Sequence, residues 1–531
     1  MKRKTWSVSS ISSLAVVIAI VVVINLIGTR VFTRADLTEK KIYTLSPASR
    51  HTVANLSDRL TVKAYFTKNL PPPYNANSEY INDVLRDYKA YSHGKFVYEF
   101  VDPANEAKLE EEAQRYRIQP AQVNVMEKDN LQVKKVYMGL VLIYGDKHET
   151  IPIIQDVDGF EYDMTSTIKR LVSDHIPKVG FLGGFGTPDL GQDMRNLTTA
   201  LSKHYDVTPV STEAGNSMID NNIDVLCIVQ PKEALDDWTK FCIDQYVMHG
   251  GKVGWFINKV KADPQTSQAS GMNLGIDDMT RGYGFAVGNN LVTDAHAAAI
   301  TVQQPQGNVM MITQVYYPAF PNITDISKQH PMVKDLQQLT LFFPSSVDTV
   351  RPVGAQVQYA PLFSSSDKTR LQVGRYDINP MAQMKREDYV GPKKLLGVAM
   401  TGTFQSFFSG KPVPHPKDST AALPSVSIVT QSPNTRMVVI GDGNFVQGQY
   451  AQGGGPNQIL FLNAVDWLSQ DQDLMSIRSR EAAIRPLKPD ISDTTKQTVK
   501  YANLFVPPAL VLMLGLFRWT AKRNRRKGVT L

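Results

Sequence analysis

The residues most suited to chemistry lie in a glycine-rich loop near the middle of the chain. Residues 178–190 read KVGFLGGFGTPDL, an apolar strand followed by closely spaced glycines and a candidate helix start. A strand that leads through glycines into a helix N-terminus is a common phosphate-binding arrangement. However, neither the lysine of a P-loop nor the spacing G-x-G-x-x-G is present. The sequence therefore favours a structural turn, with a ligand or partner contact as the alternative. The residues that would make such a contact are Gly184, Phe185, Gly186, Thr187 and Asp189.

Two acidic segments could supply a catalytic or metal-binding carboxylate. Asp442 and Asn444 lie in GDGNF (441–445), directly after an apolar strand, where α/β proteins bind ligands. A glycine-flanked turn is the competing interpretation. The segment DVDGFEYD (156–163) contains four carboxylates, but Glu161 stands where an EF-hand requires glycine. We expect a solvated acidic loop there.

Other classes of chemistry lack their residues. No G-x-S-x-G or G-x-C-x-G motif is present, so a hydrolase or amidotransferase nucleophile has no position in this sequence. The nine histidines are scattered without metal-site spacing. Cys227 and Cys242 are predicted to be buried, structural residues. The sequence predicts no catalytic residue, no cofactor and no metal.

The elements expected around the glycine loop form a large α/β region. Apolar segments alternate with segments of helical spacing, which predicts a mostly parallel sheet covered on both faces. The strands are expected at 177–183, 206–210, 223–229 and 252–257, and the helices at 191–204 and 233–249.

The rest of this region is less regular. We expect long loops and short strands over 260–350, and strand character at 393–408 and 435–446. Residues 456–470 are predicted to form an amphipathic helix. Its apolar face would contain Leu460, Ala464, Trp467 and Leu468.

An earlier region has a different order of elements. Ser46 and Pro47 are expected to begin a helix that ends near Leu56. The following order, βαβα and then two strands, predicts a thioredoxin-like domain. Its redox motif Cys-x-x-Cys is missing, which excludes thiol oxidoreductase chemistry. These elements are expected at 60–67, 77–92, 95–102 and 105–116, with a hairpin at 136–154 that turns at Gly145-Asp146.

Positive charge is concentrated at the two ends of the chain. The net charge is +7; residues 1–4 contribute three positive charges and residues 518–531 six, which leaves −2 (7 − 3 − 6) for the rest. A nucleic-acid partner is therefore not indicated. Residues 11–32 and 501–520 are apolar and close to the ~20 residues that span a bilayer. The flanking charge predicts two transmembrane helices with both termini in the cytoplasm. Pro507 and Pro508 would lie near the start of the second helix.

Several stretches together resemble the GldG family, the auxiliary component of an ABC transporter associated with bacterial gliding motility. They are DLTEKKIYTLSPAS (36–49), KVGFLGGFG (178–186), LGVAMTGTFQSFF (396–408), and VVIGDGNFVQ with NQILFLNAVDWL (within 438–468). The resemblance implies an extracytoplasmic domain related to class I glutamine amidotransferases, without the catalytic cysteine, and to a domain of intraflagellar transport proteins. It also implies a separate multi-span permease and a cytoplasmic ATPase as partners.

The glycine loop departs from that family in one respect. Members often read G-H-G-E where this chain has Gly184, Phe185, Gly186 and Thr187. The departure puts acid–base chemistry and metal binding at the loop in doubt, and a packing or recognition role remains.

The predicted fold class is α/β, with two domains anchored by two transmembrane helices. The expected segments are a cytoplasmic N-terminus (1–10), a first transmembrane helix (11–32), a thioredoxin-like α/β domain (36–172), an amidotransferase-like, mostly parallel α/β domain (173–470), a connector (471–500), a second transmembrane helix (501–520) and a basic cytoplasmic tail (521–531).

The leading functional hypothesis is a non-catalytic accessory subunit of a bacterial ABC transporter in the cytoplasmic (inner) membrane. Its helices would dock on the permease among membrane lipids, and its outer, periplasmic body would bind a substrate or an envelope partner such as a polysaccharide or peptide. Two alternatives stay open: an envelope hydrolase or carbohydrate-active enzyme that uses Asp442 and the loop 183–189, and a stand-alone ligand-binding module.

Overall fold

The computed structural model describes residues 44–469, except 73, 128–129, 155–156, 158, 174–175, 213–217, 265, 307–308, 352–355, 383–385, 417–426 and 451–454, together with 477 and 493–527. The chain forms two compact units, Met1–Ala482 and Ala483–Leu531, and each is described by itself. The first expected transmembrane helix (11–32), the segment 1–10, most of the expected connector and the last residues of the tail (528–531) lie outside the described residues.

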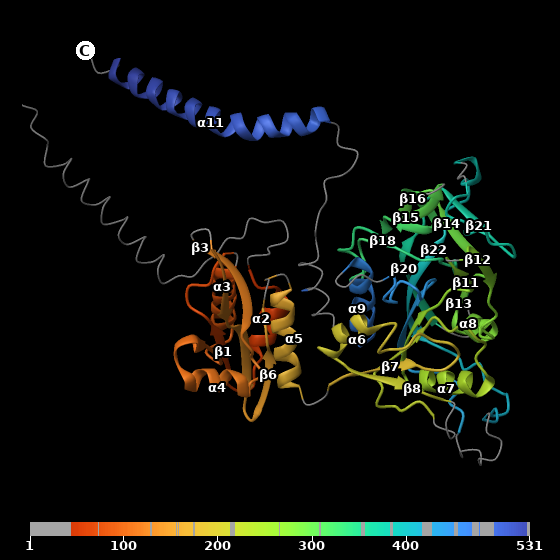
Figure 1. Ribbon diagram of the computed structural model, residues 1–531. Helices are drawn as coiled ribbons and strands as arrows, with labels where there is room; N and C mark the ends of the chain where they lie inside the picture. Colours follow the sequence, from red (N-terminus) through yellow and green to blue (C-terminus); the bar gives the residue numbers. More distant parts are fainter. Residues whose placement is uncertain are drawn as a thin grey trace, which may run out of the picture. The chain divides into compact units, whose positions relative to one another are not determined.

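A four-stranded sheet organises the first part of the larger unit (Figure 1). Its order is β2-β1-β5-β6, in which β2 is parallel to β1 while β5 and β6 are antiparallel to their neighbours. The strands are β1 (Leu60–Phe66), β2 (Phe96–Val101), β5 (Met138–Tyr144) and β6 (Lys147–Ile151). The helices are α2 (Pro47–Ala54), α3 (Tyr74–Tyr91), η1 (Pro103–Asn105), α4 (Ala107–Arg115) and α5 (Phe160–Val172), and β3 (Ala121–Glu127) and β4 (Asn130–Val136) form a separate hairpin.

Helix α5 corrects the expectation of a solvated acidic loop at 156–163 for Phe160 to Asp163, whereas Asp156 and Asp158 lie outside the described residues. Phe160, Met164 and Ile168 recur at helical spacing and are buried in the core of this region. Glu161, on the same helix, is also buried, and its Oε1 accepts hydrogen bonds from the Ser46 N–H (2.7 Å) and the Ser49 hydroxyl (2.6 Å). The sequence suggested a loop because the carboxylates masked this apolar spacing.

An eight-stranded sheet follows, in the order β17-β20-β22-β23-β10-β9-β7-β8. The five strands from β23 to β8 are parallel, and β22, β20 and β17 continue the sheet antiparallel. The parallel strands are β7 (Lys178–Leu182), β8 (Asp206–Val210), β9 (Val225–Val229), β10 (Lys252–Phe256) and β23 (Thr435–Ile440). The others are β17 (Asp325–Ile326), β20 (Gln356–Ser364) and β22 (Leu395–Thr403), and the main helices are α6 (Arg195–Ser202), α7 (Asp237–Met248), α8 (Asp277–Tyr283) and α9 (Pro456–Ser469).

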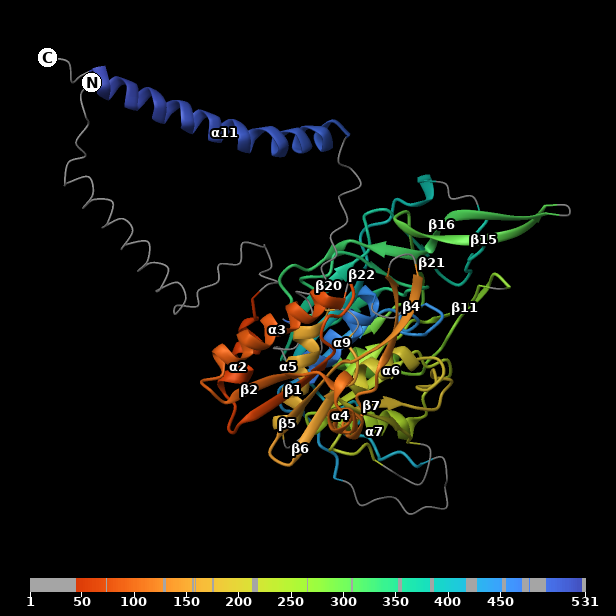
Figure 2. The same cartoon turned by 60° about the vertical axis from the view of Figure 1, so that its left-hand side comes forward.

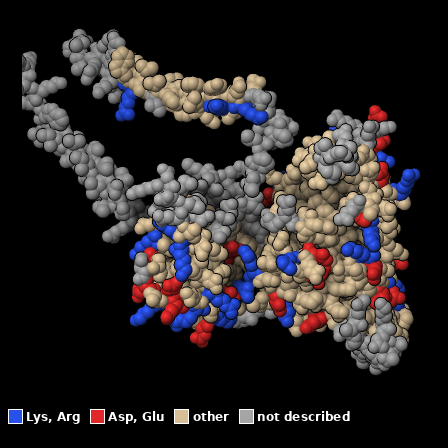
Figure 3. Space-filling view, viewed as in Figure 1, with Lys and Arg blue, Asp and Glu red and all other residues tan. Residues whose placement is uncertain are grey.

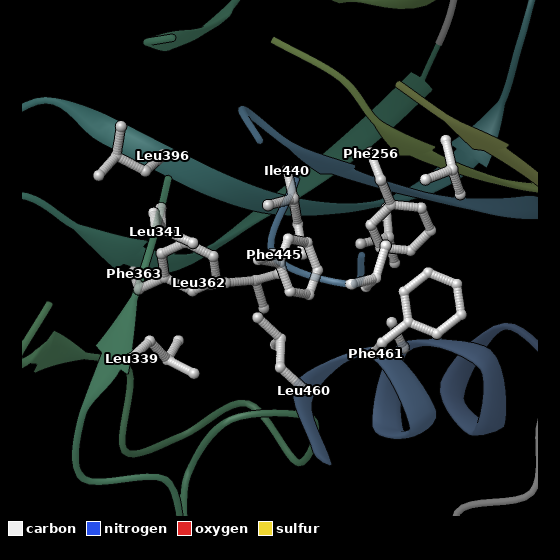
Figure 4. Close-up of a cluster of buried hydrophobic side chains, with 14 of the residues drawn as sticks. Phe256, Leu339, Leu341, Leu362, Phe363, Leu396, Ile440, Phe445, Leu460 and Phe461 are labelled. Atoms are coloured by element: carbon white, nitrogen blue, oxygen red, sulfur yellow. The ribbon is translucent and has the colours of Figure 1, made fainter. Parts of the chain in front are cut away.

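The sheet is buried on both faces, as the sequence predicts. Successive residues of β9 alternate between two cores: Cys227 lies in one, and Leu226 and Ile228 lie in the other. Figure 4 shows part of the first core, where Phe461 of α9 packs against Phe256 of β10 with ring centroids 4.5 Å apart.

Helix α9 is more deeply buried than an amphipathic helix should be. Every residue from Leu460 to Leu468 is buried, which corrects the expected solvent-facing side. Its polar residues are hydrogen-bonded instead: Asn463 Nδ2 donates to the Met332 carbonyl (2.9 Å), and Asp466 Oδ1 accepts from the Tyr205 hydroxyl (2.6 Å).

Residues 260–350 contain many short strands, as expected, but also one long hairpin (Figure 2). This hairpin consists of β15 (Ala297–Gln306) and β16 (Val309–Ile323). The short elements in and after this stretch are β11 (Val260–Asp263), β12 (Gln268–Gly271), β13 (Phe285–Val287), β14 (Leu291–Asp294), β18 (Leu339–Thr340), β19 (Val347–Thr349), β21 (Thr369–Gln372) and η2 (Arg386–Asp388).

The smaller unit contains the helix α11 (Asp493–Lys527). Its segment Thr494–Thr520 is long and apolar enough to cross a membrane, and it is the one such helix in the described part of the chain. Pro507 and Pro508 lie inside α11 and not near its start, because the helix begins before the apolar segment.

Candidate functional site

The expected site residues lie at the carboxyl edge of the parallel strands. The chain leaves β7 for β8 on one side and later returns to β9 on the other, so the strand order reverses between β7 and β9. Open α/β sheets bind ligands at such a switch point, just beyond the carboxyl ends of the strands. The loop 183–189 follows β7, and Asp442 and Asn444 follow β23 at the same edge.

Phe185 closes the glycine loop onto the loop that follows β9. Gly184, Phe185 and Gly186 all have positive φ (80°, 54° and 68°), and the Phe185 side chain is buried in the second core. The Phe185 carbonyl accepts the N–H groups of Lys232 (2.8 Å) and Glu233 (3.0 Å). Two backbone hydrogen bonds from Phe185 therefore join the two loops at the switch point.

The polar groups of Thr187 and Asp189 form hydrogen bonds within their own loop. The Thr187 N–H and hydroxyl both donate to the Gly184 carbonyl, at 3.0 and 2.9 Å. Asp189 is exposed, and its Oδ1 accepts the N–H groups of Gly191 and Gln192 at 2.8 Å each. These contacts are those of a carboxylate that caps a turn before α6.

Asp442 is fully buried and holds a neighbouring segment. Its Oδ2 accepts the Phe342 N–H and its Oδ1 accepts the Asn444 N–H, both at 2.7 Å. Burial raises the pKa of this carboxyl to about 7, against the opposing effect of these hydrogen bonds. The Asn444 amide donates to the Phe342 carbonyl (2.9 Å), so both side chains fix the backbone at Phe342.

The glycines beside Asp442 allow this close packing. A Cβ on Gly441 would lie 2.0 Å from the Ser345 carbonyl oxygen, and one on Gly443 would lie 2.3 Å from the Phe256 carbonyl oxygen. No other residue type would fit at these two positions without displacing backbone.

The structure gives the two groups of predicted residues a common edge but no direct hydrogen bond. Asp189 bonds within its loop, and Asp442 bonds toward Phe342. The link between the two loops is indirect, because the Gly448 N–H donates to the Asp193 carbonyl (2.6 Å).

Gln230 is a residue at this edge that the sequence did not single out. It follows β9 directly, has φ 42°, and is buried beside Gly443. Its N–H donates to the Phe256 carbonyl (2.9 Å), and its Oε1 lies 3.4 Å from the Asn258 N–H. A non-glycine residue with positive φ is strained, so the packing around it must hold it in place.

Lys259 is a second such residue, after β10. Its side chain is 2% exposed and forms an ion pair with Asp277 of α8. One sequence pattern could have identified Gln230 and Lys259, as it did Asp442. Each is a polar residue at the end of an apolar strand, in the stretches VLCIVQ, GWFINK and VVIGD.

Metal and thiol chemistry gain little support from the described residues. Among them, no group of three His, Cys, Asp or Glu side chains could hold a metal ion. Cys227 and Cys242 are buried thiols, as expected, and burial raises the pKa of the Cys242 thiol to about 12.

Comparison with known proteins identifies relatives over both sheet regions. A family model described as an ABC-type uncharacterized transport system matches residues 176–475, and a domain of unknown function (DUF7088) matches residues 39–143. An uncharacterized protein of Borreliella burgdorferi is 23% identical over 506 residues, which cover 92% of this chain and 94% of that protein.

Two solved structures show weaker likeness. The N-terminal domain of mmIFT52 aligns with 55% of this chain and 97% of its own, at 10% identity and a TM-score of 0.33. The exo-beta-1,4-mannosidase Op5Man5 from Opitutaceae bacterium strain TAV5 aligns with 78% of this chain and 50% of its own, at 11% identity and a TM-score of 0.21. Both TM-scores are too low to support an argument.

Proposed function

Because this chain belongs to the family of auxiliary proteins of ABC-type transport systems, we propose that it is a membrane-anchored accessory subunit that binds partners without catalysis. One observation supports the proposal that this subunit is not catalytic. At the carboxyl edge, where a ligand would bind, Phe185 is buried in the core and its carbonyl holds the loop after β9, and Asp442 is buried against the Phe342 backbone. Polar groups there stabilise the protein itself.

The two sheets support the proposed domain types. The order β2-β1-β5-β6, with β5 antiparallel and α5 after the last strand, supports a thioredoxin-like domain over 36–172. The five parallel strands with helices on both faces support an amidotransferase-like domain over 173–470.

We place the body of the protein outside the cytoplasm and both termini inside it. The candidate membrane helix in α11 and the positive charge after it support the second span of this hairpin topology. The proposed partners are a multi-span permease and, through it, a cytoplasmic ATPase, as in the GldG-type transporters that the sequence resembles. Figure 3 supports the exclusion of nucleic acid, because Lys and Arg lie among Asp and Glu on the face shown.

Labelling of an introduced cysteine tests this topology. Cys227 and Cys242 are buried, so Val373→Cys, at a position that is 68% exposed, supplies an accessible thiol. A membrane-impermeant maleimide should label Val373→Cys in intact spheroplasts, and wild type should stay unlabelled. Labelling only after the membrane is opened would place the body in the cytoplasm and contradict the topology.

Co-purification tests the partner. The full chain, solubilised from its own membranes, should retain a multi-span permease. Absence of any permease under several mild detergents would contradict the accessory-subunit proposal.

The enzyme alternative is tested separately. Thr187→Ala removes the hydroxyl of the loop and Asp189→Asn its carboxylate charge, and neither changes the buried Asp442. The proposal expects both variants to keep in vivo function, and its loss at normal protein levels would favour chemistry or ligand binding at the loop.

A further inference from the structure

Helix α11 differs in chemistry around its circumference. Its candidate membrane segment, Thr494–Thr520, contains five charged or amide residues, two prolines and one glycine. At about 100° per residue, these residues fall within about 140° of the circumference, and we call this side the polar face. They are Lys496, Gln497, Lys500, Asn503, Pro507, Pro508, Gly515 and Arg518. From Ala502 to Phe517, the rest of the circumference contains only Ala, Phe, Val, Leu and Met.

The two prolines remove hydrogen-bond donors from the polar face. Proline has no N–H, so Pro507 and Pro508 cannot donate to the carbonyls of Asn503 and Leu504, four residues earlier. Asn503 is the tenth residue of the candidate membrane segment (503 − 494 + 1). Residues 499–519 contain no Ser or Thr that could supply a hydroxyl, and lipid chains have no donor. A neighbouring helix is one source of donors for such carbonyls within a membrane.

The side opposite the polar face is suited to lipid. Its large apolar side chains are exposed, for example Phe505 (61%) and Leu512 (68%). The Thr498 hydroxyl, on this side, donates to the Thr494 carbonyl (2.8 Å), so it is satisfied within the helix. Polar residues of membrane helices face other protein segments or water, because lipid leaves them unsatisfied. One side of α11 therefore suits lipid and the other suits protein.

We propose that the polar face of α11 packs against a transmembrane helix of a different, multi-span membrane protein. The partner helix would bring N–H or O–H donors to the depth of Asn503 and Leu504. Gly515 lets the two backbones approach closely. Lys500 and Arg518, at the two ends of the apolar stretch, favour acidic partner groups near the membrane boundaries. This inference rests on the accessory-subunit function proposed above and adds the side of α11 that makes the contact.

A second copy of this chain is a poorer partner for the polar face. Copies of one chain cross the membrane in the same direction, so a two-fold contact between parallel helices places each residue beside its own counterpart. Lys500 would then lie beside Lys500, and Arg518 beside Arg518. The segment Thr494–Thr520 contains no Asp or Glu that would offset this repulsion, whereas a different protein can present acidic groups.

Photo-cross-linking of the full chain in its own membranes tests the side of the contact. Leu514 and Leu516 are 67% and 59% exposed but lie about 200° apart around α11, with Leu514 on the polar face. Leu514→benzoylphenylalanine should cross-link the multi-span protein that co-purifies with wild type, at least tenfold more than Leu516→benzoylphenylalanine.

The outcomes of this experiment separate the two proposals. Equal yields, a higher yield from the Leu516 variant, or an adduct of two copies from the Leu514 variant would overturn the assignment of the polar face. The accessory-subunit function would survive those results as long as the permease co-purifies with wild type. Failure of that co-purification would contradict the accessory-subunit function and this inference with it.

Added bulk on the helix tests the same contact without cross-linking. Gly515→Leu blocks close approach at the polar face and should lower the permease retained by the solubilised full chain at least fivefold. Ala509→Leu adds bulk about 120° away, outside the polar face, and should retain the permease like wild type. Protection of Cys227 and Cys242 from thiol reagents reports that both variants are folded. Equal retention by the two folded variants refutes packing at the polar face.

Discussion

Phe185 combines a strained backbone with a buried side chain at the candidate site. Its ring is buried in the second core while its φ is 54°, a conformation that disfavours any residue with a Cβ. Its side chain must therefore gain more from burial than its backbone loses in strain. Loops 183–189 and 230–233 meet because of this balance.

Substitution of Phe185 separates these two effects. Phe185→Ala should destabilise the body by about 3–5 kcal/mol through the lost ring. Phe185→Gly loses the same ring but relieves the backbone strain. Its free energy of unfolding should therefore equal that of Phe185→Ala or exceed it by up to about 1 kcal/mol. Thermal unfolding of the two variants measures the order. At an ordinary buried position alanine would be the more stable, and that order here would contradict the strain argument.

Asp442 should make stability depend on pH. Its native pKa of about 7 lies above the ordinary value of 3.8. At a pH between these two values, the native state keeps a proton that the unfolded state has released. Stability should therefore fall as pH rises from about 4 to about 7, by an amount on the order of 1–4 kcal/mol.

Asp442→Asn is the matched variant for this pH dependence of stability, because its side chain cannot ionise. The melting temperature of wild type should fall relative to that of Asp442→Asn between pH 4.5 and pH 7.5. Asp189→Asn, at an exposed position on the same edge, serves as the control and should follow wild type. Parallel curves for wild type and Asp442→Asn would show that Asp442 does not titrate in this range.

At the scale of elements, a single carboxyl group connects helices α2 and α5. Glu161 of α5 accepts from the Ser46 N–H and the Ser49 hydroxyl at the start of α2, and Ser46 is itself the N-cap of that helix. The Thr165 hydroxyl lies 2.8 Å from that of Ser49 and extends the network. The motif LSPAS therefore does more than begin a helix: it attaches α2 to α5.

Removal of this carboxyl should loosen α2. Glu161→Ala removes the acceptor of buried donors and should cost roughly 1–3 kcal/mol, whereas Glu161→Gln keeps an acceptor oxygen and should cost less. Protease cleavage within residues 44–56 should rise in the alanine variant.

Asp163→Ala is the control for this experiment. Asp163 lies on the same helix, and its side chain is 34% exposed and forms an ion pair with the exposed Lys203. Its loss should cost no more than about 1 kcal/mol. Equal cleavage of the Glu161→Ala and Asp163→Ala variants would mean that Glu161 does not hold α2.

At the scale of the whole molecule, α11 is the candidate contact with a transporter. Deletion of residues 493–531 should abolish co-purification of the permease while the body stays folded, because α11 belongs to a compact unit of its own. Protection of the buried Cys227 and Cys242 measures folding in the same sample. Retention of the permease by the deleted chain would move the contact to another part of the protein.

The sequence by itself determined the order of elements wherever apolar periodicity was unbroken. The strands at Leu60–Phe66, Lys178–Leu182 and Lys252–Phe256 and the burial of Cys227 follow from local apolar runs, because such runs must leave water. The sequence also restricted the candidate site to the loops after β7 and β23, since polar residues and glycines follow those strands.

Only the tertiary structure decided what these residues contact. The acidic segment at Glu161 is a helix, the polar side of α9 is buried, and Asp442 bonds to Phe342, a hundred residues earlier in the chain. Each outcome depends on a partner distant in sequence that satisfies a buried polar group. Local pattern cannot reveal such a partner, because the balance between burial and hydrogen bonding is set only once the chain has folded.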